Sequence, residues 1–362
     1  MAVTSYGTND PLSNKLWSKK LSVEALKQCW ADKFIGPGTD SVIQLKNETQ
    51  KAAGDKITYG LRMQLQQLGI LGDGTLEGNE EALATFSDSV VINQLRGSVR
   101  SAGRMSQQRV PFSIRDEALS GLKDWWSTRF DFGFFNQVGG NTAQLNTQLT
   151  GLQAVVAPDT AHQIWQNAQT TDASITAVDT FTLQMLDYAV ERAKTLDPTN
   201  STTATTGVPI RPVMMNGGEY YVAVLHPYQV TSMRTSTTTG QWLDIEKSAM
   251  TGGEITDNPI FTGALGVYNN VVIHSDARIP LGNNNTTTTY ANCRRAVFLG
   301  AQAAAIAFGQ DNGPERFTWV EELFDYENQL GVAAGTIFGL KKITFNSLDF
   351  STIVLSTYAT SH

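Results

Sequence analysis

The chain of 362 residues predicts an α+β fold, because helical and strand patterns are mixed without regular alternation. Two stretches, around residues 111–140 and 177–196, carry apolar residues at helical spacing. Several short runs rich in β-branched and aromatic residues lie between and after them, which is typical of strands. Since no strand–helix–strand unit repeats, a doubly wound parallel sheet is not expected.

The composition indicates a polar surface that carries little charge. Charged residues make up 17% of the chain, and the net charge is −7. A low charge density fits a protein whose faces are covered by partners, and it fits equally a β-rich soluble protein with many turns. The acidic balance excludes tight nucleic-acid binding, which normally requires a basic excess. A weakly acidic wall could still enclose DNA, because packed DNA must stay mobile.

Residues 1–40 predict an N-terminal arm with a short helix. Ser22 is the expected N-cap, Trp17 is an additional apolar anchor, and residues 36–38 (Gly-Pro-Gly) end the helix. One stripe of this helix is apolar: Val23, Leu26, Trp30 and Phe34. Because so short a helix is unstable alone, it must lie on its own body or on a neighbouring copy.

Residues 41–110 predict a long β-hairpin. Apolar and polar residues alternate from Ile57 to Leu65, a second strand is expected at 89–95, and residues 69–78 form a glycine-rich tip. An isolated two-stranded hairpin is marginal in water. Its apolar face therefore rests on another surface, or the hairpin packs on its own domain.

Opposite charges gather at the two ends of this hairpin. Four acidic residues are expected near the tip, and four arginines are expected at the base: Asp73, Glu77, Glu80 and Glu81, against Arg96, Arg100, Arg104 and Arg109. This arrangement suits docking of one copy's tip on the base of a neighbour. The alternative is two solvated patches, since exposed ion pairs contribute little individually.

The segment 111–140 gives the clearest helix. Ser113 is a plausible N-cap, Asp116 lies in the first turn, and residues 139–140 (Gly-Gly) end the helix. Its apolar stripe consists of Leu119, Leu122, Trp126 and Phe130, followed by further aromatic residues. We expect a central packing helix. A helix lying on a membrane surface is the weaker alternative, because the polar face is mixed in charge.

The segment 177–196 predicts a second helix, with one apolar stripe formed by Phe181, Met185, Tyr188, Ala189 and Ala193. Short strands are expected at 220–225 and 267–273, and His226 begins a turn or helix. Three Thr- and Asn-rich stretches, 199–207, 235–240 and 283–289, are interpreted as exposed loops. Residues 295–309 indicate a helix of small residues, followed by β-rich sequence to the C-terminus.

Catalytic and metal-binding motifs are not expected. The four histidines lack metal-ligand spacing, and the two cysteines, Cys29 and Cys293, form no Cys-x-x-Cys pair. Buried thiols in a reducing compartment are the interpretation. We expect no cofactor, no signal peptide and no membrane span. The remaining catalytic hypothesis is a β-rich hydrolase using His226, Glu321 and Glu322. Against it, aromatic and apolar residues interleave with the acids, which favours a strand with one wet face.

Several stretches together resemble the major capsid proteins of tailed phages with the HK-97-like fold, closest to the N-four-type coat-protein family. The closing stretches that carry the resemblance are 295–309, 321–328, 335–345 and 349–359. Earlier matching stretches are Gly54–Tyr59, Gly69–Glu81, Gln107–Val110 and His226–Tyr228, with Leu299–Ala303 and Phe338–Ile343 matching inside the closing part.

The resemblance implies four regions and a structural function. These are an N-terminal arm (1–40), an extended E-loop (41–110), a peripheral domain with a long spine helix (111–211 and 319–362) and an axial domain (212–318). It implies a non-enzymatic shell protein in the virion, made in the host bacterial cytoplasm. Its expected partners are itself in hexamers and pentamers, scaffolding, portal and decoration proteins, and weakly contacted double-stranded DNA. Trp17 and Trp30 join the charged hairpin residues as candidate contacts between subunits. An encapsulin-like nanocompartment is the alternative with the same fold.

Overall fold

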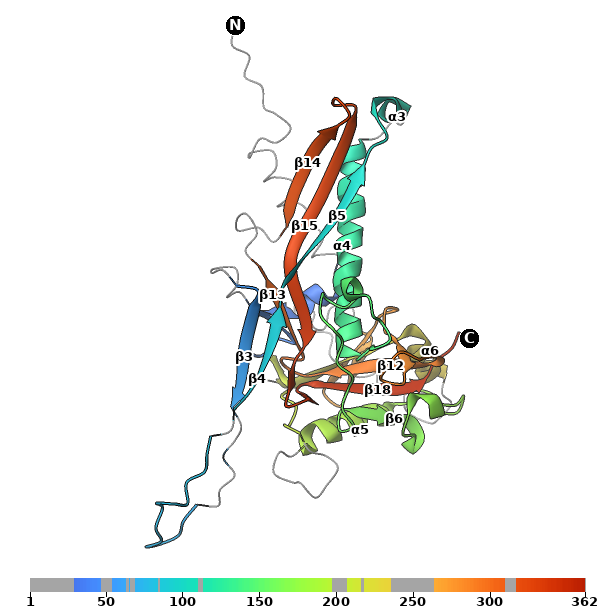
Figure 1. Ribbon diagram of the computed structural model, residues 1–362. Helices are drawn as coiled ribbons and strands as arrows, with labels where there is room; N and C mark the ends of the chain where they lie inside the picture. The colour runs from blue at the N-terminus through green and yellow to red at the C-terminus, as the bar shows by residue number, and fades with distance from the viewer. Residues whose placement is uncertain are drawn as a thin grey trace.

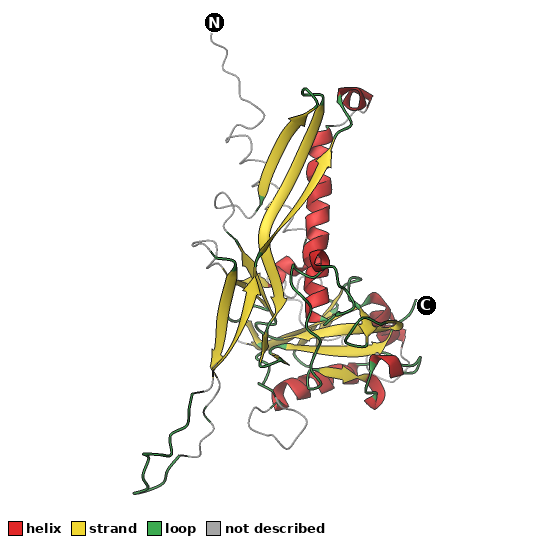
Figure 2. Ribbon diagram, in the orientation of Figure 1, coloured by secondary structure: helices red, strands yellow, loops and turns green. Residues whose placement is uncertain are grey.

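The computed structural model describes residues 29–46, 54–62, 65, 69–83, 85–109, 113–196, 207–215, 218–235, 264–309 and 317–361. Within them, two large sheets and one long helix form the body, and a hairpin projects from it (Figures 1 and 2). The predicted α+β class is confirmed. The helices are α3 (Arg104–Arg109), α4 (Ile114–Val138), α5 (Leu183–Thr195) and α6 (Pro227–Thr235), with 3₁₀ turns η1 (Trp30–Phe34), η2 (Thr147–Leu149), η3 (Gln166–Ala168) and η4 (Asp172–Ser174).

The first sheet has six strands and is built on β15 (Gln329–Lys342). The upper half of β15 lies between two antiparallel neighbours, and its lower half continues the sheet through β13. The other strands are β1 (Ile35–Gly36), β2 (Ile43–Lys46), β5 (Asn93–Arg100), β13 (Ala304–Phe308) and β14 (Thr318–Phe324). Helix α4 runs along one face of this sheet (Figure 1).

Helix α4 confirms the predicted spine helix almost to the residue. Ser113 is its N-cap, and the side-chain oxygen accepts a 3.4 Å hydrogen bond from the backbone N–H of Asp116. The helix ends where Gly140 adopts φ +60°, a conformation that favours glycine. All four residues of the predicted stripe are buried, and the ring of Trp126 lies 5.1 Å from that of Phe317. This aromatic layer buries one face of the six-stranded sheet.

The second sheet has eight strands and lies below the first in Figure 1. Its strands are β6 (Gln163–Trp165), β7 (Val213–Met215), β8 (Gly218–Leu225), β9 (Gly266–Tyr268), β10 (Val271–Ser275), β11 (Leu281–Asn283), β12 (Thr289–Leu299) and β18 (Thr352–Tyr358). Its central strands are continuous apolar runs, which is typical of a sheet covered on both faces. Helix α5 packs on one face through Met185, Leu186 and Ala189, which are fully buried.

Strand pairing divides the chain differently from the four predicted regions. Strand β13, placed by sequence with the axial region, pairs with β15 in the six-stranded sheet. Strand β18, placed with the spine helix, pairs with β12 in the eight-stranded sheet. The last 60 residues therefore cross between the two sheets twice, once into β13 and once into β18. A small hairpin, β16 (Thr344–Phe345) with β17 (Leu348–Asp349), lies at the second crossing.

The predicted helix of small residues at 295–309 is wrong. Residues up to Leu299 belong to β12, and residues 304–308 form β13. All five residues of β13 are buried, because β2 and β15 pair with its two edges, the core around α4 covers one face, and the strands at 56–62 and 85–91 cover the other. Alanine has a high intrinsic preference for helix, but the two flanking strands and the close packing of its small side chains override that preference here.

Two other predicted elements have different bounds. Helix α5 begins at Leu183 rather than Ala177, so Phe181 is buried ahead of the helix and Tyr188 is 46% exposed. The predicted strand 267–273 is two strands, β9 and β10, joined by Asn269 and Asn270 with φ of 46° and 60°. Asparagine tolerates this left-handed conformation, so an Asn-Asn pair forms a tight hairpin turn.

A buried charge joins the end of α4 to the eight-stranded sheet. Arg295 on β12 is fully buried, and its guanidinium nitrogen Nε donates to Oδ2 of Asp172 at 2.7 Å. Its other nitrogens donate to the carbonyl of Gly140 at 2.8 Å and to that of Asn283 at 2.8 Å. Because Gly140 follows the end of α4, this one side chain ties the spine helix to the eight-stranded sheet. Arginine suits this site because its guanidinium group holds five hydrogen-bond donors in one fixed plane, and all five have acceptors here.

Candidate assembly surfaces

The hairpin β3 (Lys56–Arg62) with β4 (Thr85–Val91) confirms that this region contains a hairpin with a tip at residues 69–78. The predicted second strand, 89–95, has the wrong bounds, because it covers the end of β4 and the start of β5, and β5 pairs with β15. Its tip, residues 69–83, extends away from the body (Figure 1). Asp73, Glu77 and Glu80 are exposed on this tip, and Glu81 is half-buried. Three leucines are also largely exposed: Leu71 at 95%, Leu76 at 58% and Leu83 at 57%. The tip therefore presents apolar side chains together with carboxylates.

The root of the hairpin packs on its own body. Ile57 and Val90 are buried against Ala305, Ala307 and Ile343. This confirms packing on its own domain for the root, while the tip stays uncovered. Asp88 fixes the attachment, because its carboxylate pairs with Lys341 and accepts hydrogen bonds from the Tyr59 hydroxyl and the Thr344 backbone, both at 3.1 Å. Burial, with the negative charge of Asp88 beside it, raises the pKa of Tyr59.

The four arginines do not gather at the base of the hairpin as predicted. Arg96 and Arg100 stand opposite Gly335 and Gly331 along β5. Arg104 and Arg109 continue onto α3, which lies at the upper end of the body in Figure 1. They form a row, because β5 leaves the hairpin in an extended conformation and carries each arginine further from the root. The row is called the arginine row below.

The arginine row borders a face of small residues. Gly331, Ala333 and Gly335 of β15 share the face that points away from α4, with β5 on one side and β14 on the other. The Arg100 guanidinium lies 4.3 Å from the centre of the Phe324 ring, a cation–π contact. On the β14 side Val320 is 51% exposed. Sequence reasoning missed this face, although Gly, Ala and Gly at alternate positions of a predicted strand would indicate it.

The described part of the arm packs on its own body. The 3₁₀ turn η1 replaces the last part of the predicted helix 22–34, whose earlier residues and Trp17 lie outside the described residues. The Trp30 ring lies 5.2 Å from that of Phe135 and 5.7 Å from the ring of buried His274.

Asp131 of α4 holds the same segment of the arm. Its carboxylate accepts hydrogen bonds from the Cys29 thiol at 2.9 Å and from the Ala31 N–H at 3.1 Å, and it pairs with Arg278. Burial raises the pKa of Cys29 to about 12, so this thiol is protonated and unreactive. Trp30 thus contacts its own subunit, and its predicted contact with a neighbouring subunit stays a prediction.

The residues of the hydrolase hypothesis lie on different sheets. His226 precedes α6 beside the eight-stranded sheet, whereas Glu321 and Glu322 lie on β14. Glu321 is buried, pairs with Arg115 and accepts a 2.8 Å hydrogen bond from the Trp319 indole. The predicted wet face is therefore formed by Val320 and Glu322, with Trp319 and Glu321 on the buried side. The structure does not bring the three residues into one catalytic site.

His226 is expected to make stability depend on pH. Burial, together with the nearby Arg294 charge, lowers its pKa from 6.5 to about 4. Below pH 6.5 His226 is protonated in the unfolded chain but stays neutral in the folded chain. The free energy of unfolding therefore falls as the pH falls toward 4. At about pH 5 this loss is on the order of 2 kcal/mol. Urea unfolding of the wild type and of His226→Gln checks it: the variant should lose less stability between neutral and acidic pH. An equal loss in both would contradict the assignment.

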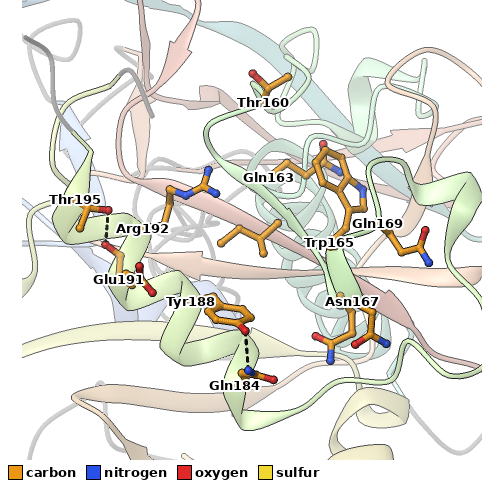
Figure 3. A pocket seen from close by; sticks show the side chains of 13 residues that line it. Thr160, Gln163, Trp165, Asn167, Gln169, Gln184, Tyr188, Glu191, Arg192 and Thr195 are labelled. Carbon is orange, nitrogen blue, oxygen red and sulfur yellow. Dashed lines mark hydrogen bonds between the residues drawn. The ribbon is translucent and has the colours of Figure 1, made fainter. Parts of the chain in front are cut away.

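A polar cleft of about 730 Å³ opens between β6 and α5. Trp165, Asn167 and Gln169 line it on the β6 side, opposite Tyr188 and Gln184 of α5 (Figure 3). The Gln184 amide donates to the Tyr188 hydroxyl at 2.6 Å. Its lining includes one carboxylate, Glu191, and no histidine or cysteine, so it offers no pair of carboxylates, no imidazole base and no thiol.

The described ranges also bear on metal binding and membrane spanning. Within these residues, His, Cys, Asp and Glu side chains form no group of three or more that could hold a metal ion. In the same part of the chain, no helix has both the length and the apolar content needed to cross a membrane.

Comparison with known proteins gives a consistent result. The model of the phage capsid protein family matches residues 5–361. The major capsid protein of Pseudomonas phage KPP25 is 27% identical, over 92% of this chain and 90% of that protein. The capsid of Ralstonia phage GP4 has a TM-score of 0.80 at 33% identity, over 99% of both chains. The cyanophage Pam1 capsid has a TM-score of 0.71 at 17% identity, over 93% of this chain and 94% of that one, which shows the fold alone.

These matches cover nearly the whole chain. The predicted HK-97-like fold is confirmed, and so is the resemblance to phage capsid proteins. The chain belongs to the phage capsid protein family.

Proposed function

We propose that this chain is the major capsid protein of a tailed phage, and that copies of it assemble into the icosahedral shell around the double-stranded DNA genome. The family match and the similarity to a curated major capsid protein support this. The observation that carries it in the structure is the projecting hairpin tip, whose leucines are uncovered in the single chain. Apolar side chains on an extended element are stabilised when a neighbouring subunit covers them.

The finer parts of the prediction remain proposals. They are the virion location with synthesis in the host cytoplasm, weak contact with packaged DNA, and the scaffolding, portal and decoration partners. They also include hexamers and pentamers, the absence of catalysis, the N-four-type branch, and the division into arm, E-loop, peripheral and axial regions. Strand pairing supports assigning β13 to the peripheral region and β18 to the axial region.

Electron microscopy of the expressed protein, with and without co-expressed phage scaffold, tests the assembly directly. Closed shells of uniform size are the expected result, and nuclease-protected DNA inside phage particles supports genome packaging. An enzyme inside the particles in place of DNA would favour an encapsulin-like compartment. A protein that stays monomeric under all these conditions would contradict a shell function.

The arginine row is the proposed docking surface for a neighbour's hairpin tip. The tip carries Asp73, Glu77, Glu80 and Glu81 with exposed leucines, and the row carries Arg96 and Arg100 beside a face of small residues. The carboxylates of the tip and the guanidinium groups of Arg96 and Arg100 are complementary in charge. The side chains of Phe324 and Arg96 lie over Gly331 and Gly335, so the leucines of the tip would pack on these side chains. The pairing explains why a long element with little local packing is retained.

Arg100→Glu is expected to impair assembly and to leave the monomer folded. Arg100 is exposed and contacts Phe324 in its own chain, so the substitution should change monomer stability by less than about 1 kcal/mol. Between subunits the substitution replaces attraction to the neighbour's acidic tip by repulsion, and this change recurs at every copy of the contact. Sedimentation should show soluble subunits in place of shells, with an unchanged circular dichroism spectrum. Lys194→Glu on α5, which changes another exposed cation, is the matched control, and normal shells from Arg100→Glu would defeat the proposed docking.

A further inference from the structure

The turn between β14 and β15 has an unusual backbone. Three consecutive non-glycine residues, Asp325, Tyr326 and Glu327, adopt φ of 52°, 49° and 66°. Residues with side chains seldom adopt this left-handed conformation, and runs of it are rarer still. Such conformations persist where surrounding contacts fix them, and they concentrate at functional positions.

Asn328 fixes this turn. Its backbone N–H donates to the Asp325 carbonyl at 3.0 Å, and its side-chain oxygen accepts from the Arg104 N–H at 3.2 Å. Gln329 adds a hydrogen bond from its side chain to the Ala102 carbonyl at 3.3 Å. These contacts join the turn to the start of α3, as Figures 1 and 2 show at the upper end of the body. The turn 325–328 and α3 are together called the distal cap.

The distal cap presents side chains that its own chain leaves uncovered. Tyr326 is fully exposed, and Met105 is 66% exposed. Arg104 and Glu327 are 72% and 71% exposed, and their charged atoms are 3.9 Å apart, the limit of an ion pair. The fixed backbone presents Tyr326 beside the Arg104–Glu327 pair, and tyrosine and arginine are among the residue types that dominate binding energy at interfaces.

We propose that the distal cap is a contact between copies of this chain, in which Tyr326 packs against a second copy's cap and Arg104 of one copy pairs with Glu327 of the next. The inference rests on the proposed shell function. The occupant is a second copy because the exposed charges of the cap balance, two cations (Arg104 and Arg109) against two anions (Asp325 and Glu327), so each cap is complementary in charge to another. Arg104 then belongs to this contact, while Arg96 and Arg100 remain with the hairpin tip.

Charge exchange between separate copies gives a sharp test. Arg104→Glu and Glu327→Arg each place like charges together, both within a chain and between chains. Each variant alone is expected to lose most shell formation. In an equal mixture the charges within every chain still repel, but contacts between the two kinds of copy become attractive. Shells containing both variants, recovered by sedimentation and identified by mass spectrometry, would therefore establish the contact between copies.

Two results would overturn the proposal. One is normal shell formation by either single variant. The other is a mixture that assembles no better than the separate variants, because only a contact between chains is restored by mixing. Wild-type protein that forms no shells would instead reject the proposed function, so the two failures are distinguishable.

Tyr326→Ala tests the apolar part separately. We expect it to lower the yield of shells at least tenfold while the circular dichroism spectrum stays unchanged. Leu145→Ala is the matched control, because Leu145 is an apolar side chain that is 75% exposed outside the cap. Equal yields from Tyr326→Ala and Leu145→Ala would contradict the assignment of Tyr326.

Discussion

Arg295→Met should destabilise the monomer by about 3–5 kcal/mol, the largest loss expected from a single substitution in this chain. The variant leaves the Asp172 carboxylate fully buried without its cation. It also removes the donors that satisfy the carbonyls of Gly140 and Asn283, both at 2.8 Å. Methionine replaces the aliphatic part of the arginine side chain and lacks only the guanidinium end, so the loss mainly reports the charge and hydrogen bonds of that group.

Chemical denaturation measures this loss when each protein also carries Arg100→Glu, which is expected to keep the subunits monomeric. Two further variants make the result interpretable. Arg211→Met removes an arginine whose pair with Asp40 is half exposed, so we expect a change below about 1 kcal/mol. Asp172→Asn added to Arg295→Met should recover part of the loss, because a neutral amide needs no buried cation. Similar stabilities for Arg295→Met and Arg211→Met would show that Arg295 does not hold the end of α4 on the eight-stranded sheet.

Elements determined by local sequence could be predicted closely. Helix α4 was predicted because Ser113, the aromatic stripe and Gly139–Gly140 each act within a few residues of one another. The hairpin and strand β8 follow in the same way from alternating or continuous apolar runs. In contrast, β13 could not be predicted, because residues 304–308 become a strand only through β2 and β15, which are distant in the sequence.

The surface residues also divide into those that local sequence predicts and those whose position depends on distant parts of the chain. The acidic tip was predicted, since its residues are adjacent in the sequence. The arginines were predicted as a group and are instead a row, because their positions depend on the path of β5 along β15. The sequence did not indicate Tyr326 or Asn328 as contact residues. Asn328 holds the left-handed turn that exposes Tyr326, and that turn contains no glycine that would indicate its conformation. Buried pairs such as Arg295 with Asp172 lie 123 residues apart and have no local signal.

Replacing residues 63–84 with Asn-Gly is expected to abolish shell formation and to leave a folded monomer. Arg62 and Thr85 stand opposite each other at the end of the β3–β4 pair, so a two-residue turn can close the hairpin there. The root keeps its contacts with Ile343 and its ion pair between Asp88 and Lys341. The free energy of unfolding should therefore change little, whereas every subunit loses the exposed leucines and carboxylates of its tip.

A second variant separates the two kinds of contact that the tip supplies. Changing Asp73, Glu77 and Glu80 to their amides keeps the leucines and removes charge. If docking on the arginine row steers assembly, this variant should form shells slowly, and added salt should slow the wild type toward the same rate. Shells that form from the truncated chain at the wild-type rate would mean that the tip is not needed. The uncovered leucines would then need another explanation, and the distal cap and the arm would have to hold neighbouring copies together without it.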